Sequence, residues 1–455
     1  MLDFAMKKSR LLLLLLPLSL SAQKPNIIFM IGDGMGPSYT AAYRYYHDDP
    51  KTKEVERTIY DELFVGSCST YSYENPAVVT DSAAAATALA TGVKTRNGHI
   101  GVDENNNVLP TLLEKAKLAG YQTAMVVTST LTHATPASFI AHHNDREEEV
   151  EIAKDYLKKN SAKQLKFDLL MGGGLKYFKQ AHKSFKQQLK TEKIALYTDV
   201  KSLDVIKKLP AMVFIDDNKP PFAIDAKKQG LGKLRTKKMT DKALSLMDEK
   251  RPFFMMIEGS QIDWCGHSND IACVMREMDD FTEAIKVAKA YVDKHKNTLL
   301  IITADHSTGG LGIGNKISKK STLAKKERKR KAYTWRPELI KAVNISAKEM
   351  TKKVYHLKSS IKMKDLFQKY MKIELTKKEL KKIKEKRAKP CEKFNKCKLH
   401  DYITKLVDKR SETGWTTHGH TAVDVPIFAY GNSALLFHGF MDNTDISKKI
   451  ATLLK

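Results

Sequence analysis

Cysteine is scarce in this chain: only five of its 455 residues are cysteines, and none stands in a pattern typical of a nucleophile or a zinc ribbon. Cysteine-based catalysis is therefore not expected. We predict that Cys68, Cys265 and Cys273 are buried small apolar residues. Cys391 and Cys397 flank a short basic loop and could form a disulfide. Because the number is odd, at least one thiol stays unpaired if the chain is exported.

Long apolar runs, internal repeats and low-complexity linkers are also missing beyond residue 22. No stretch there approaches the ~20 apolar residues that a membrane span needs. Hydrophobic residues make up 42% and charged residues 29% of the chain, which is an ordinary globular composition. It excludes wholesale disorder and a multi-span membrane protein. At about 150 residues per domain, the length allows one large domain or two to three smaller ones.

The N-terminus has the three parts of a secretory leader. Lys7, Lys8 and Arg10 precede a leucine-rich run, and small residues follow up to Ala22. The apolar run is shorter than a membrane span, so a cleaved signal peptide over residues 1–22 is favoured over an N-terminal anchor. We expect the mature chain to be periplasmic or secreted, with no integral membrane span.

The positive charge is concentrated in one segment. The net charge is +26, and residues 315–410 contain 33 Lys and Arg against 10 Asp and Glu. Their apolar residues have helical spacing, which predicts a basic helical insertion into a domain formed by residues 23–314 and 411–455. The charge fits either a solvated cationic face or a contact with polyanions or the envelope surface, since only this segment could attract a polyanion.

Apolar runs of strand length alternate with amphipathic stretches of helix length. Continuous β-rich runs separated by helices are typical of a large, mostly parallel sheet with helices on both faces, so the sequence predicts an α/β fold. The expected strands are Asn26 to Ile31, Gln122 to Val127, Phe167 to Met171, Met212 to Ile215, Phe253 to Ile257, Thr298 to Thr303 and Val425 to Tyr430. The expected helices include Thr111 to Leu118, Thr240 to Asp248 and Arg276 to Asp293.

Three of the expected strands run into acidic or imidazole residues. These are Asp33, Glu258, Asp263, His267, Asp305 and His306. Ligands of an open parallel sheet bind outside the carboxyl ends of the strands, so these side chains are expected to converge. Packed acids without cations would repel one another and shift their pKa values. Metal ions are therefore implied, and the residue types suit zinc and magnesium.

A serine stands at the start of an alanine-rich helix. Thr80, Asp81 and Ser82 precede the run from Ala83 to Gly92, and Asp81 or a neighbour can cap the helix. The amides and dipole at this end can hold a phosphate, and a hydroxyl beside a metal ion can become a nucleophile. Read alone, the segment fits an ordinary alanine-rich, capped helix better than a phosphate site.

Several segments, taken together and in order, resemble the alkaline phosphatase family. They read NIIFMIGDGMG at 26–36, VTDSAA at 79–84, GGG at 172–174, EGSQID at 258–263, TADH at 303–306 and HT at 420–421. The resemblance covers nearly the whole mature chain except the basic insertion. It implies hydrolysis of phosphate monoesters, a phosphoserine intermediate, and two Zn²⁺ ions and one Mg²⁺ ion per chain. Members are often dimers, so a homodimer is also allowed.

The resemblance also implies roles for individual residues. Ser82 matches the family's nucleophile. The implied ligands are Asp263, His267 and His420 for one zinc ion, Asp33, Asp305 and His306 for the other, and Asp33, Thr135 and Glu258 for magnesium. Two metal ions about 4 Å apart can stabilise both the entering and the leaving oxygen of an in-line displacement.

Arg146 resembles the family's arginine that grips two phosphate oxygens, a bidentate contact that lysine makes poorly. A diester replaces one of those oxygens with a bulky group, so Arg146 favours monoesters. A phosphodiesterase or sulfatase of the same superfamily stays open as an alternative. A second alternative, from another class, is a polyanion- or surface-binding protein that acts through the basic insertion.

Two positions near the expected site vary within the family, and one zinc-ligand position has two candidate histidines. His133 and Trp264 stand where some members have Asp and Lys. We predict that His133 tunes the magnesium site from outside its ligand set, and that Trp264 lines the phosphate pocket. Asp81 is expected in the pocket or next to the ligands. His420 is preferred to His418 as a zinc ligand because the residues that follow it continue the family segment.

Overall fold

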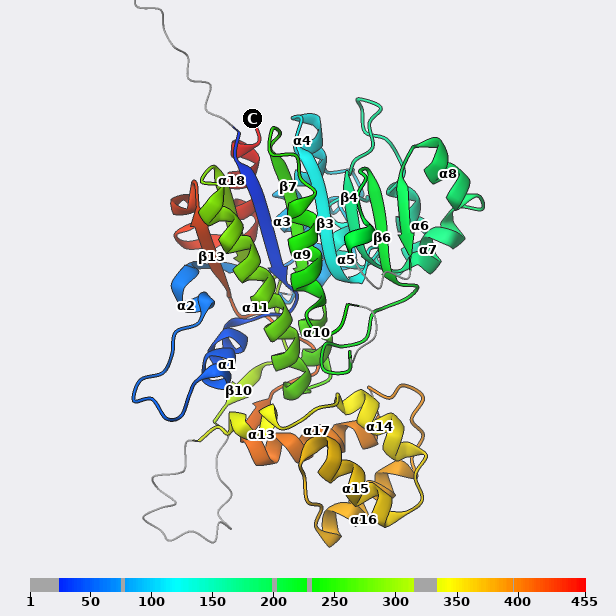
Figure 1. Cartoon of the computed structure of the whole chain (residues 1–455), viewed down its shortest axis with the longest axis vertical. Coiled ribbons are helices and arrows are strands. Elements are labelled where there is room, and N and C mark those ends of the chain that lie inside the picture. Colours follow the sequence, from blue (N-terminus) through cyan, green and yellow to red (C-terminus); the bar gives the residue numbers. More distant parts are fainter. Residues whose placement is uncertain (1–23, 75–77, 199–202, 227–230, 315–333, 396) are drawn as a thin grey trace, which may run out of the picture.

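The computed structural model describes residues 24–74, 78–198, 203–226, 231–314, 334–395 and 397–455. A ten-stranded sheet runs through it in the order β14-β2-β13-β8-β1-β7-β3-β4-β6-β5 (Figure 1). Its strands are β1 Asn26–Gly32, β2 Phe64–Ser69, β3 Gln122–Thr130, β4 Leu169–Gly173, β5 Ala195–Thr198, β6 Ala211–Asp216, β7 Phe253–Gly259, β8 Thr298–Thr303, β13 Val425–Gly431 and β14 Gly439–Asp442. The predicted signal peptide, residues 1–22, lies outside the described residues.

Neighbouring strands of this sheet are parallel except at β13, which is antiparallel to both β8 and β2. The predicted α/β fold with a mostly parallel sheet is thereby confirmed, and each expected strand is present within a few residues of its expected bounds. The sequence does not predict β2, β5 or β14. These strands lie toward the two ends of the sheet, where partial exposure weakens the hydrophobic signal.

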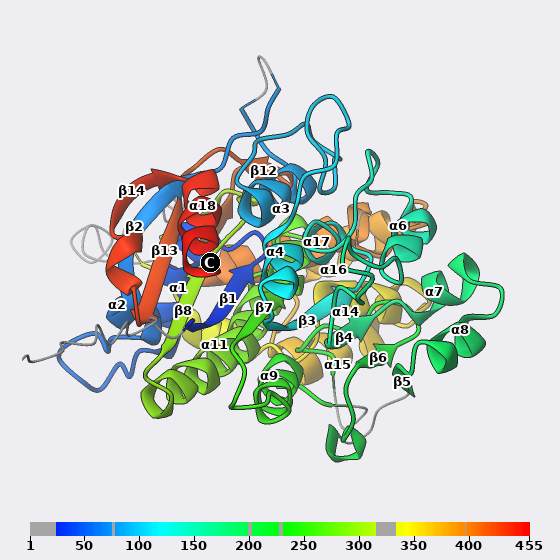
Figure 2. The ribbon, with the colours of Figure 1, turned by 90° about the horizontal axis from the view of Figure 1, so that it is seen from above.

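Helices cover both faces of the sheet (Figure 2). The helices α9 (Arg235–Ser245) and α11 (Ile271–Lys294) lie on one face, and α3 (Ser82–Thr91), α4 (Leu112–Leu118) and α18 (Asn443–Leu453) lie on the other. The others before the insertion are α1 Pro37–His47, α2 Ile59–Leu63, α5 Ala134–Ala137, α6 Glu149–Asp155, α7 Leu175–Ala181, α8 Phe185–Thr191 and α10 Gln261–His267. Throughout the described ranges, no helix has the length and apolarity that crossing a membrane requires.

The three expected helices are present. The helix expected at Thr111 to Leu118 is α4, which begins at a capping box, and Arg276 to Asp293 lies within α11. The helix expected at Thr240 to Asp248 is α9, which begins earlier, at Arg235. Arg235 is buried and its guanidinium lies 2.8 Å from the carboxylate of Glu277. A buried charge of this kind interrupts the hydrophobic pattern, so the pattern does not mark the start of α9 at Arg235.

The described part of the basic segment is helical. Its helices are α13 Pro337–Lys341, α14 Ala347–Tyr355, α15 Ser360–Met371, α16 Lys377–Arg387 and α17 Lys398–Ser411. They follow β10 (Leu311–Ile313) and precede β11 (Thr413–Trp415), which pair with each other. Figure 1 shows these helices beyond the end of the sheet at which α10 lies. The domain bounds stay a prediction, and residues 315–333 lie outside the described residues.

Two disulfides, Cys265–Cys273 and Cys391–Cys397, are present, and Cys68 is free and buried. Cys265 and Cys273 are buried, as predicted, but the disulfide between them was not predicted. The corner between α10 and α11 brings their Cα atoms to 5.5 Å, within the span of a disulfide. The sequence spacing alone did not show that a corner forms there.

Glu114 ties α4 to two neighbouring segments. Its Oε1 atom lies 3.0 Å from His142 Nε2 and 2.9 Å from Lys166 Nζ. Burial raises the pKa of Glu114, but the contacts with His142 and Lys166 outweigh burial and lower the pKa to about 2. The stability that this carboxylate contributes is therefore present above its ordinary pKa of 4.5 and is lost as the pH falls from there toward 2.

We expect Glu114→Gln to lower the free energy of unfolding at neutral pH by about 3 kcal/mol and to remove part of its acid dependence. Chemical denaturation from neutral pH down to the acid limit measures both effects. The control is Glu151→Gln, which breaks an exposed pair with Lys154 and should cost less than about 1 kcal/mol. Equal losses in the two variants would contradict the prediction.

Candidate active site

Three central strands deliver acidic and imidazole residues to one edge of the sheet. β1 runs into Asp33, β7 carries Glu258 near its end, and β8 runs into Asp305 and His306. Because β1 pairs in parallel with β7 on one side and β8 on the other, the three ends are level. All four side chains are completely buried. The predicted convergence at the carboxyl ends of the strands is confirmed.

Ser82 is the first residue of α3. The carboxylate of Asp81 caps this helix by accepting a hydrogen bond from the N–H group of Ala84, and it accepts a second one from the N–H group of Gly98, beyond the helix, each at 2.9 Å. Ser82 is buried, and its Oγ atom lies 3.1 Å from His306 Nε2. The helix therefore presents a serine hydroxyl, at the positive end of its dipole, to the acidic residues.

Asp263, His267 and His420 form the first group of candidate ligands, with ligand atoms within 4.8 Å of one another. His267 Nε2 lies 3.3 Å from the Asp263 carboxylate and 3.0 Å from His420 Nε2. The Nδ1 atoms face backbone carbonyls, that of Thr80 for His420 and that of His418 for His267. Nδ1–H groups that donate to these carbonyls leave both Nε2 lone pairs aimed at one point.

His418 points elsewhere. Its Nδ1 atom lies 2.9 Å from the carbonyl oxygen of His267, and its Nε2 atom faces the Asn269 amide at 3.5 Å. The structure thus brings His420 rather than His418 to the first group, as the sequence predicts. Its role as a ligand stays a prediction.

Asp33, Asp305 and His306 form the second group. His306 Nε2 lies 3.5 Å from Asp33 Oδ1 and 3.3 Å from Asp305 Oδ2, and its ring stacks on His420 with 3.6 Å between centroids. Asp305 Oδ1 accepts a hydrogen bond from the N–H group of Gly34 at 3.0 Å. Both oxygens of Asp33 and Oδ2 of Asp305 have no hydrogen-bond partner. Orphaned buried oxygens of this kind are suited to a cation.

Glu258, Thr135 and His133 lie around Asp33 as a third group. Glu258 Oε2 accepts hydrogen bonds from two serine hydroxyls, whereas Glu258 Oε1, Thr135 Oγ1 and His133 Nδ1 are buried without a partner. The ligand atoms of Asp33, His133 and Glu258 lie within 4.8 Å of one another. His133 therefore stands among the candidate ligands, whereas the sequence placed it outside them. His133 stands at the N-cap position of α5 without a side-chain capping hydrogen bond, and its ring lies beside Asp33 and Glu258.

Burial and mutual repulsion raise the pKa values of these carboxyl groups. The pKa of Asp33 is raised well above its ordinary value by burial and then by Asp305, Asp263 and Glu258. Burial is also the main cause that raises the pKa of Glu258 to about 8 and that of Asp305 to about 6. Burial lowers the pKa of His306. Divalent cations would relieve this repulsion, and the donors fit zinc in the first and second groups and magnesium at the oxygens around Asp33.

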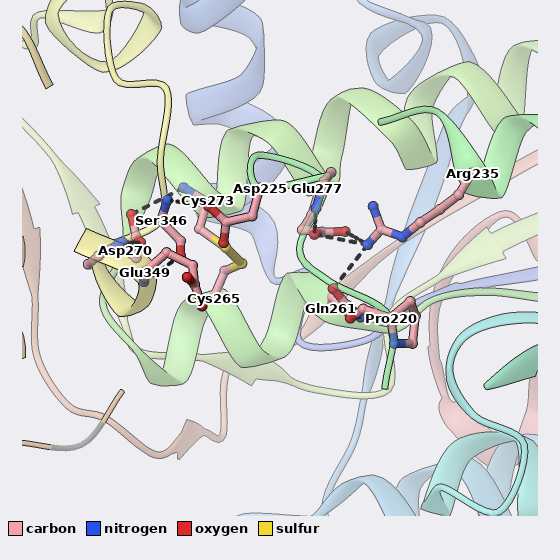
Figure 3. Close-up of a disulfide and its surroundings, with 12 residues drawn as sticks. Pro220, Asp225, Arg235, Gln261, Cys265, Asp270, Cys273, Glu277, Ser346 and Glu349 are labelled. Atoms are coloured by element: carbon pink, nitrogen blue, oxygen red, sulfur yellow. Dashed lines mark hydrogen bonds and ion pairs between the residues drawn. A yellow bond between two sulfur atoms is a disulfide. The ribbon is translucent and has the colours of Figure 1, made fainter. Parts of the chain in front are cut away.

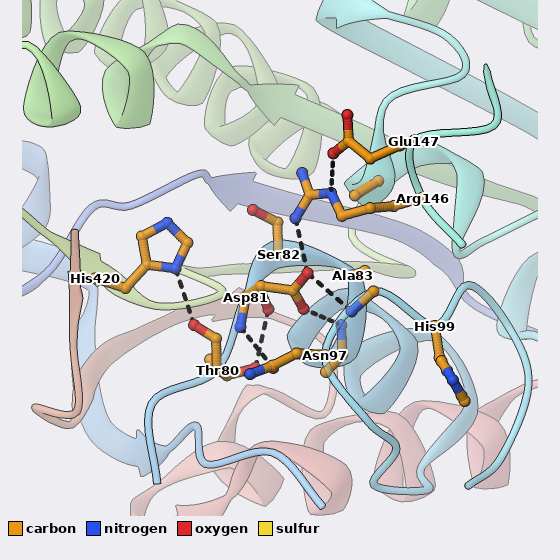
Figure 4. Close-up of polar contacts among 12 residues, drawn as sticks. Thr80, Asp81, Ser82, Ala83, Asn97, His99, Arg146, Glu147 and His420 are labelled. Carbon is orange, nitrogen blue, oxygen red and sulfur yellow. Dashed lines mark hydrogen bonds and ion pairs between the residues drawn. The ribbon is translucent and has the colours of Figure 1, made fainter. Parts of the chain in front are cut away.

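In the view of Figure 4, Arg146 approaches Ser82 from the side opposite His420. Its Nη1 atom lies 3.0 Å from the Asp81 carboxylate, and its Nε atom lies 3.9 Å from the exposed carboxylate of Glu147. Burial acts against the charge, but Asp81 outweighs it and raises the pKa of Arg146. In the view of Figure 4, the Ser82 hydroxyl lies between the Arg146 guanidinium and the His420 ring.

Trp264 lies next to the third group. Its ring meets the His133 ring edge-on at 5.5 Å, and Lys219 Nζ lies 4.6 Å from the centroid of the Trp264 ring. Burial, and then Arg146 and Lys219, lower the pKa of His133, which keeps it neutral. Trp264 also lines a cavity beside the site. That it contacts phosphate stays a prediction.

Residues that the sequence did not point to also hold the site together; they are Ser129, Lys219, Ser260 and Thr308. The Thr308 hydroxyl donates to Asp263 and lies 3.2 Å from His306 Nδ1. The Ser260 hydroxyl donates to Glu258. Serine and threonine are too common to mark a site, and the only signal was that Ser260 and Thr308 stand within two residues of a candidate ligand.

Comparison with known proteins identifies the same family that the sequence motifs resemble. The family model described as alkaline phosphatase matches residues 24–455, which includes the basic segment that the sequence resemblance left out. The chain is 40% identical to alkaline phosphatase 3 of Bacillus subtilis over 431 residues, which cover 94% of this chain and 89% of that protein.

Solved structures are similar over the same length. The cold-active alkaline phosphatase of a psychrophilic Shewanella species matches with a TM-score of 0.83 and 38% identity, over 94% of this chain and 100% of that one. A histidine-to-glutamate variant of the alkaline phosphatase from the Antarctic bacterium TAB5, with Mg bound in its M3 site, matches with a TM-score of 0.66 and 27% identity, over 95% and 98% of the two chains.

Proposed function

Because the chain belongs to the alkaline phosphatase family, we propose that its phosphomonoesterase activity proceeds through a phosphoserine intermediate on Ser82 and depends on two Zn²⁺ ions and one Mg²⁺ ion. One observation carries this proposal. Beside Ser82, both oxygens of Asp33 and one oxygen each of Asp305 and Glu258 are buried without a partner. Buried ionised carboxylates need cations, and the hydroxyl that these cations would face is that of Ser82.

The donor groups divide between the ions by their chemistry. The zinc ligands are Asp263, His267 and His420 at one site and Asp33, Asp305 and His306 at the other, and the magnesium ligands are Asp33, Thr135 and Glu258. Bound ions at these places lower the pKa of the serine hydroxyl and of water, and they stabilise charge on the leaving oxygen. The chain's own residues then bind and orient the phosphoryl group.

Two displacements complete the reaction. Ser82 Oγ gives up its proton and attacks phosphorus, the bond from phosphorus to the leaving oxygen breaks, and the leaving alcohol takes up one proton. Water then attacks the phosphoserine, the bond from phosphorus to Oγ breaks, Ser82 regains a proton and inorganic phosphate leaves. The first amides of α3 and the guanidinium of Arg146 hold the oxygens that do not react.

Arg146 tests the substrate class. The Asp81 carboxylate contacts Nη1 of Arg146 and holds the guanidinium in place. The remaining N–H donors can then bind two phosphate oxygens. We expect Arg146→Lys to lower kcat/KM for p-nitrophenyl phosphate by about 10- to 100-fold. The loss for bis-p-nitrophenyl phosphate should be much smaller, because a diester has two non-bridging oxygens where a monoester has three, so one fewer is left for Arg146 beside the metal ions. Steady-state kinetics with both substrates measure the difference.

The matched control for this prediction is Arg44→Lys. Arg44 pairs with Asp61 away from the site, so its substitution should change neither rate. Equal losses on the monoester and the diester in Arg146→Lys would contradict the role given to Arg146. A wild-type preference for the diester or for p-nitrophenyl sulfate would support a phosphodiesterase or a sulfatase instead.

Export is part of the same proposal. The leader-like residues 1–22 and the two disulfides, Cys265–Cys273 and Cys391–Cys397, support a periplasmic or secreted protein, because disulfides persist in oxidising compartments. A homodimer and a contact of residues 315–410 with polyanions or the envelope surface stay predictions.

A further inference from the structure

A cavity of about 650 Å³ opens beside His267 and Trp264. Its walls come from the loop around Pro220, from α10, and from the insertion helices α14 and α15. The volume lies within the range of small-molecule sites, ~300–1,000 Å³. About a third of the His267 side chain is exposed (32%), so the first ligand group faces open space on this side.

The insertion wall of the cavity is fixed to the corner between α10 and α11 (Figure 3). The N–H group of Ser346 donates to Asp225 Oδ1 at 2.9 Å, and that of Ala347 donates to Asp270 Oδ2 at 2.6 Å. These carboxylates satisfy the first amides of α14 and complement its dipole. The Cys265–Cys273 disulfide braces the same corner.

The loop on the other side of the cavity is equally fixed. Gln261 of α10 donates from Nε2 to the carbonyl oxygen of Pro220 at 2.9 Å, and its Oε1 atom accepts from Arg235 Nη2 at 3.0 Å. Arg235 in turn pairs with Glu277, and both are buried. Both walls are therefore held in place relative to α10. Ligand binding would lose little free energy to ordering them.

The direction of the proposed reaction points into this cavity. In an in-line displacement, the leaving group departs on the side opposite the nucleophile. Ser82 contacts His306, the His420 ring stacks on that of His306, and His267 lies 3.0 Å beyond His420. The leaving group therefore departs toward His267, where the cavity begins.

Lysines and rings line the cavity together. The Nζ atoms of Lys219, Lys348 and Lys353 lie 4.6, 5.7 and 5.7 Å from the ring centroids of Trp264, Phe222 and Tyr370. No carboxylate of the described residues pairs with any of these three ammonium groups. Asp225 and Glu349 also line the cavity, so its three ammonium groups outnumber its two carboxylates, and Asp225 Oδ1 is already occupied by the N–H group of Ser346.

We propose that this cavity is a leaving-group subsite that selects phosphate monoesters whose leaving group joins a planar ring system to a further anionic group. The ring packs against Phe222, Trp264 and Tyr370, and the anion meets Lys348 and Lys353 on the insertion side. The subsite rests on the proposed function, because it concerns the leaving group of that reaction. It also gives the insertion a part in substrate selection.

Two nearly isosteric substrates test the anionic part of the subsite. One is a naphthyl phosphate with a sulfonate on its far ring, and the other carries a neutral sulfonamide there. In the double variant Lys348→Gln/Lys353→Gln, kcat/KM for the sulfonate should fall about three- to tenfold, and that for the sulfonamide should stay within about twofold. The control Lys352→Gln/Lys358→Gln removes two exposed charges outside the cavity and should change neither value.

A second variant tests the ring part. Tyr370→Leu should lower kcat/KM for both naphthyl substrates by about threefold and leave hydrolysis of glycerol phosphate, which has no ring, unchanged. Equal losses on the naphthyl substrates and glycerol phosphate would count against ring binding at this place.

The outcomes separate the subsite from the proposed function. An unchanged ratio of sulfonate to sulfonamide rates in the lysine double variant, with normal hydrolysis of p-nitrophenyl phosphate, would overturn the subsite alone. An equal loss in the control variant would indicate long-range steering and would also overturn it. A metal-loaded wild-type protein that hydrolyses no monoester would overturn the proposed function and the subsite with it.

Discussion

Replacing Ser82 with alanine should abolish hydrolysis of phosphate monoesters, with a loss in kcat of about four orders of magnitude or more. The substitution removes one oxygen and leaves the helix cap intact, because the hydrogen bond from the Ala84 N–H group to Asp81 does not involve the serine side chain. The loss is therefore chemical and not a failure to fold. Steady-state kinetics measure it, and a brief reaction with radiolabelled substrate followed by acid quenching shows whether a phosphorylated peptide forms.

Ser138→Ala is the matched control for this experiment. Ser138 is buried against the same helix, where its hydroxyl contacts Thr87 and the carbonyl oxygen of Ala134. Its loss disturbs the packing of α3 without reaching the candidate ligands, so activity and labelling should persist. Substantial turnover by Ser82→Ala, or label on a peptide that lacks Ser82, would rule out the phosphoserine step as assigned.

Replacing His420 with alanine should lower kcat at least about 100-fold at limiting zinc and should lower the zinc content of the purified protein. Removal of a group that only orients a metal ligand typically lowers metal affinity or activity by about 10- to 100-fold. Removal of a ligand itself should lower them further. His420 Nε2 lies 3.0 Å from His267 Nε2 and 3.7 Å from Asp263 Oδ1. Metal analysis and zinc titration of the activity measure both effects.

The chain offers a closely matched control in His418→Ala, two positions earlier. The His418 ring faces the His267 carbonyl oxygen and Asn269, away from the ligand group. We expect this variant to keep its zinc and most of its activity. The reverse result, with His418→Ala losing zinc and His420→Ala keeping it, would mean that the ligand set has been assigned to the wrong histidine.

Much of the fold could be predicted because the central strands are buried on both faces. β1, β7 and β8 read as continuous apolar runs, and this pattern is distinctive. β2 is partly exposed and contains Gly66, so no such pattern marks it. The Cys265–Cys273 disulfide escaped prediction for another reason, since it depends on the angle between two helices.

The candidate site was predictable where strand ends supply its residues. Asp33, Asp305 and His306 follow apolar strands directly, so the topology alone brings them together. His133 was predictable as a neighbour but not as a candidate ligand, because the direction of a side chain at a short helix start depends on packing. The cavity between α14 and the loop around Pro220 has no sequence signature, because it forms only when the insertion docks on the α10–α11 corner.

The most direct test of the account is the hydrolysis of p-nitrophenyl phosphate, bis-p-nitrophenyl phosphate and p-nitrophenyl sulfate by the full-length mature protein, before and after removal of metals with EDTA and refilling with zinc and magnesium. We predict that the monoester is hydrolysed fastest, that EDTA abolishes this activity and that the two metals restore it. Monoester hydrolysis that survives complete metal removal, or a preference for the diester or the sulfate, would contradict it.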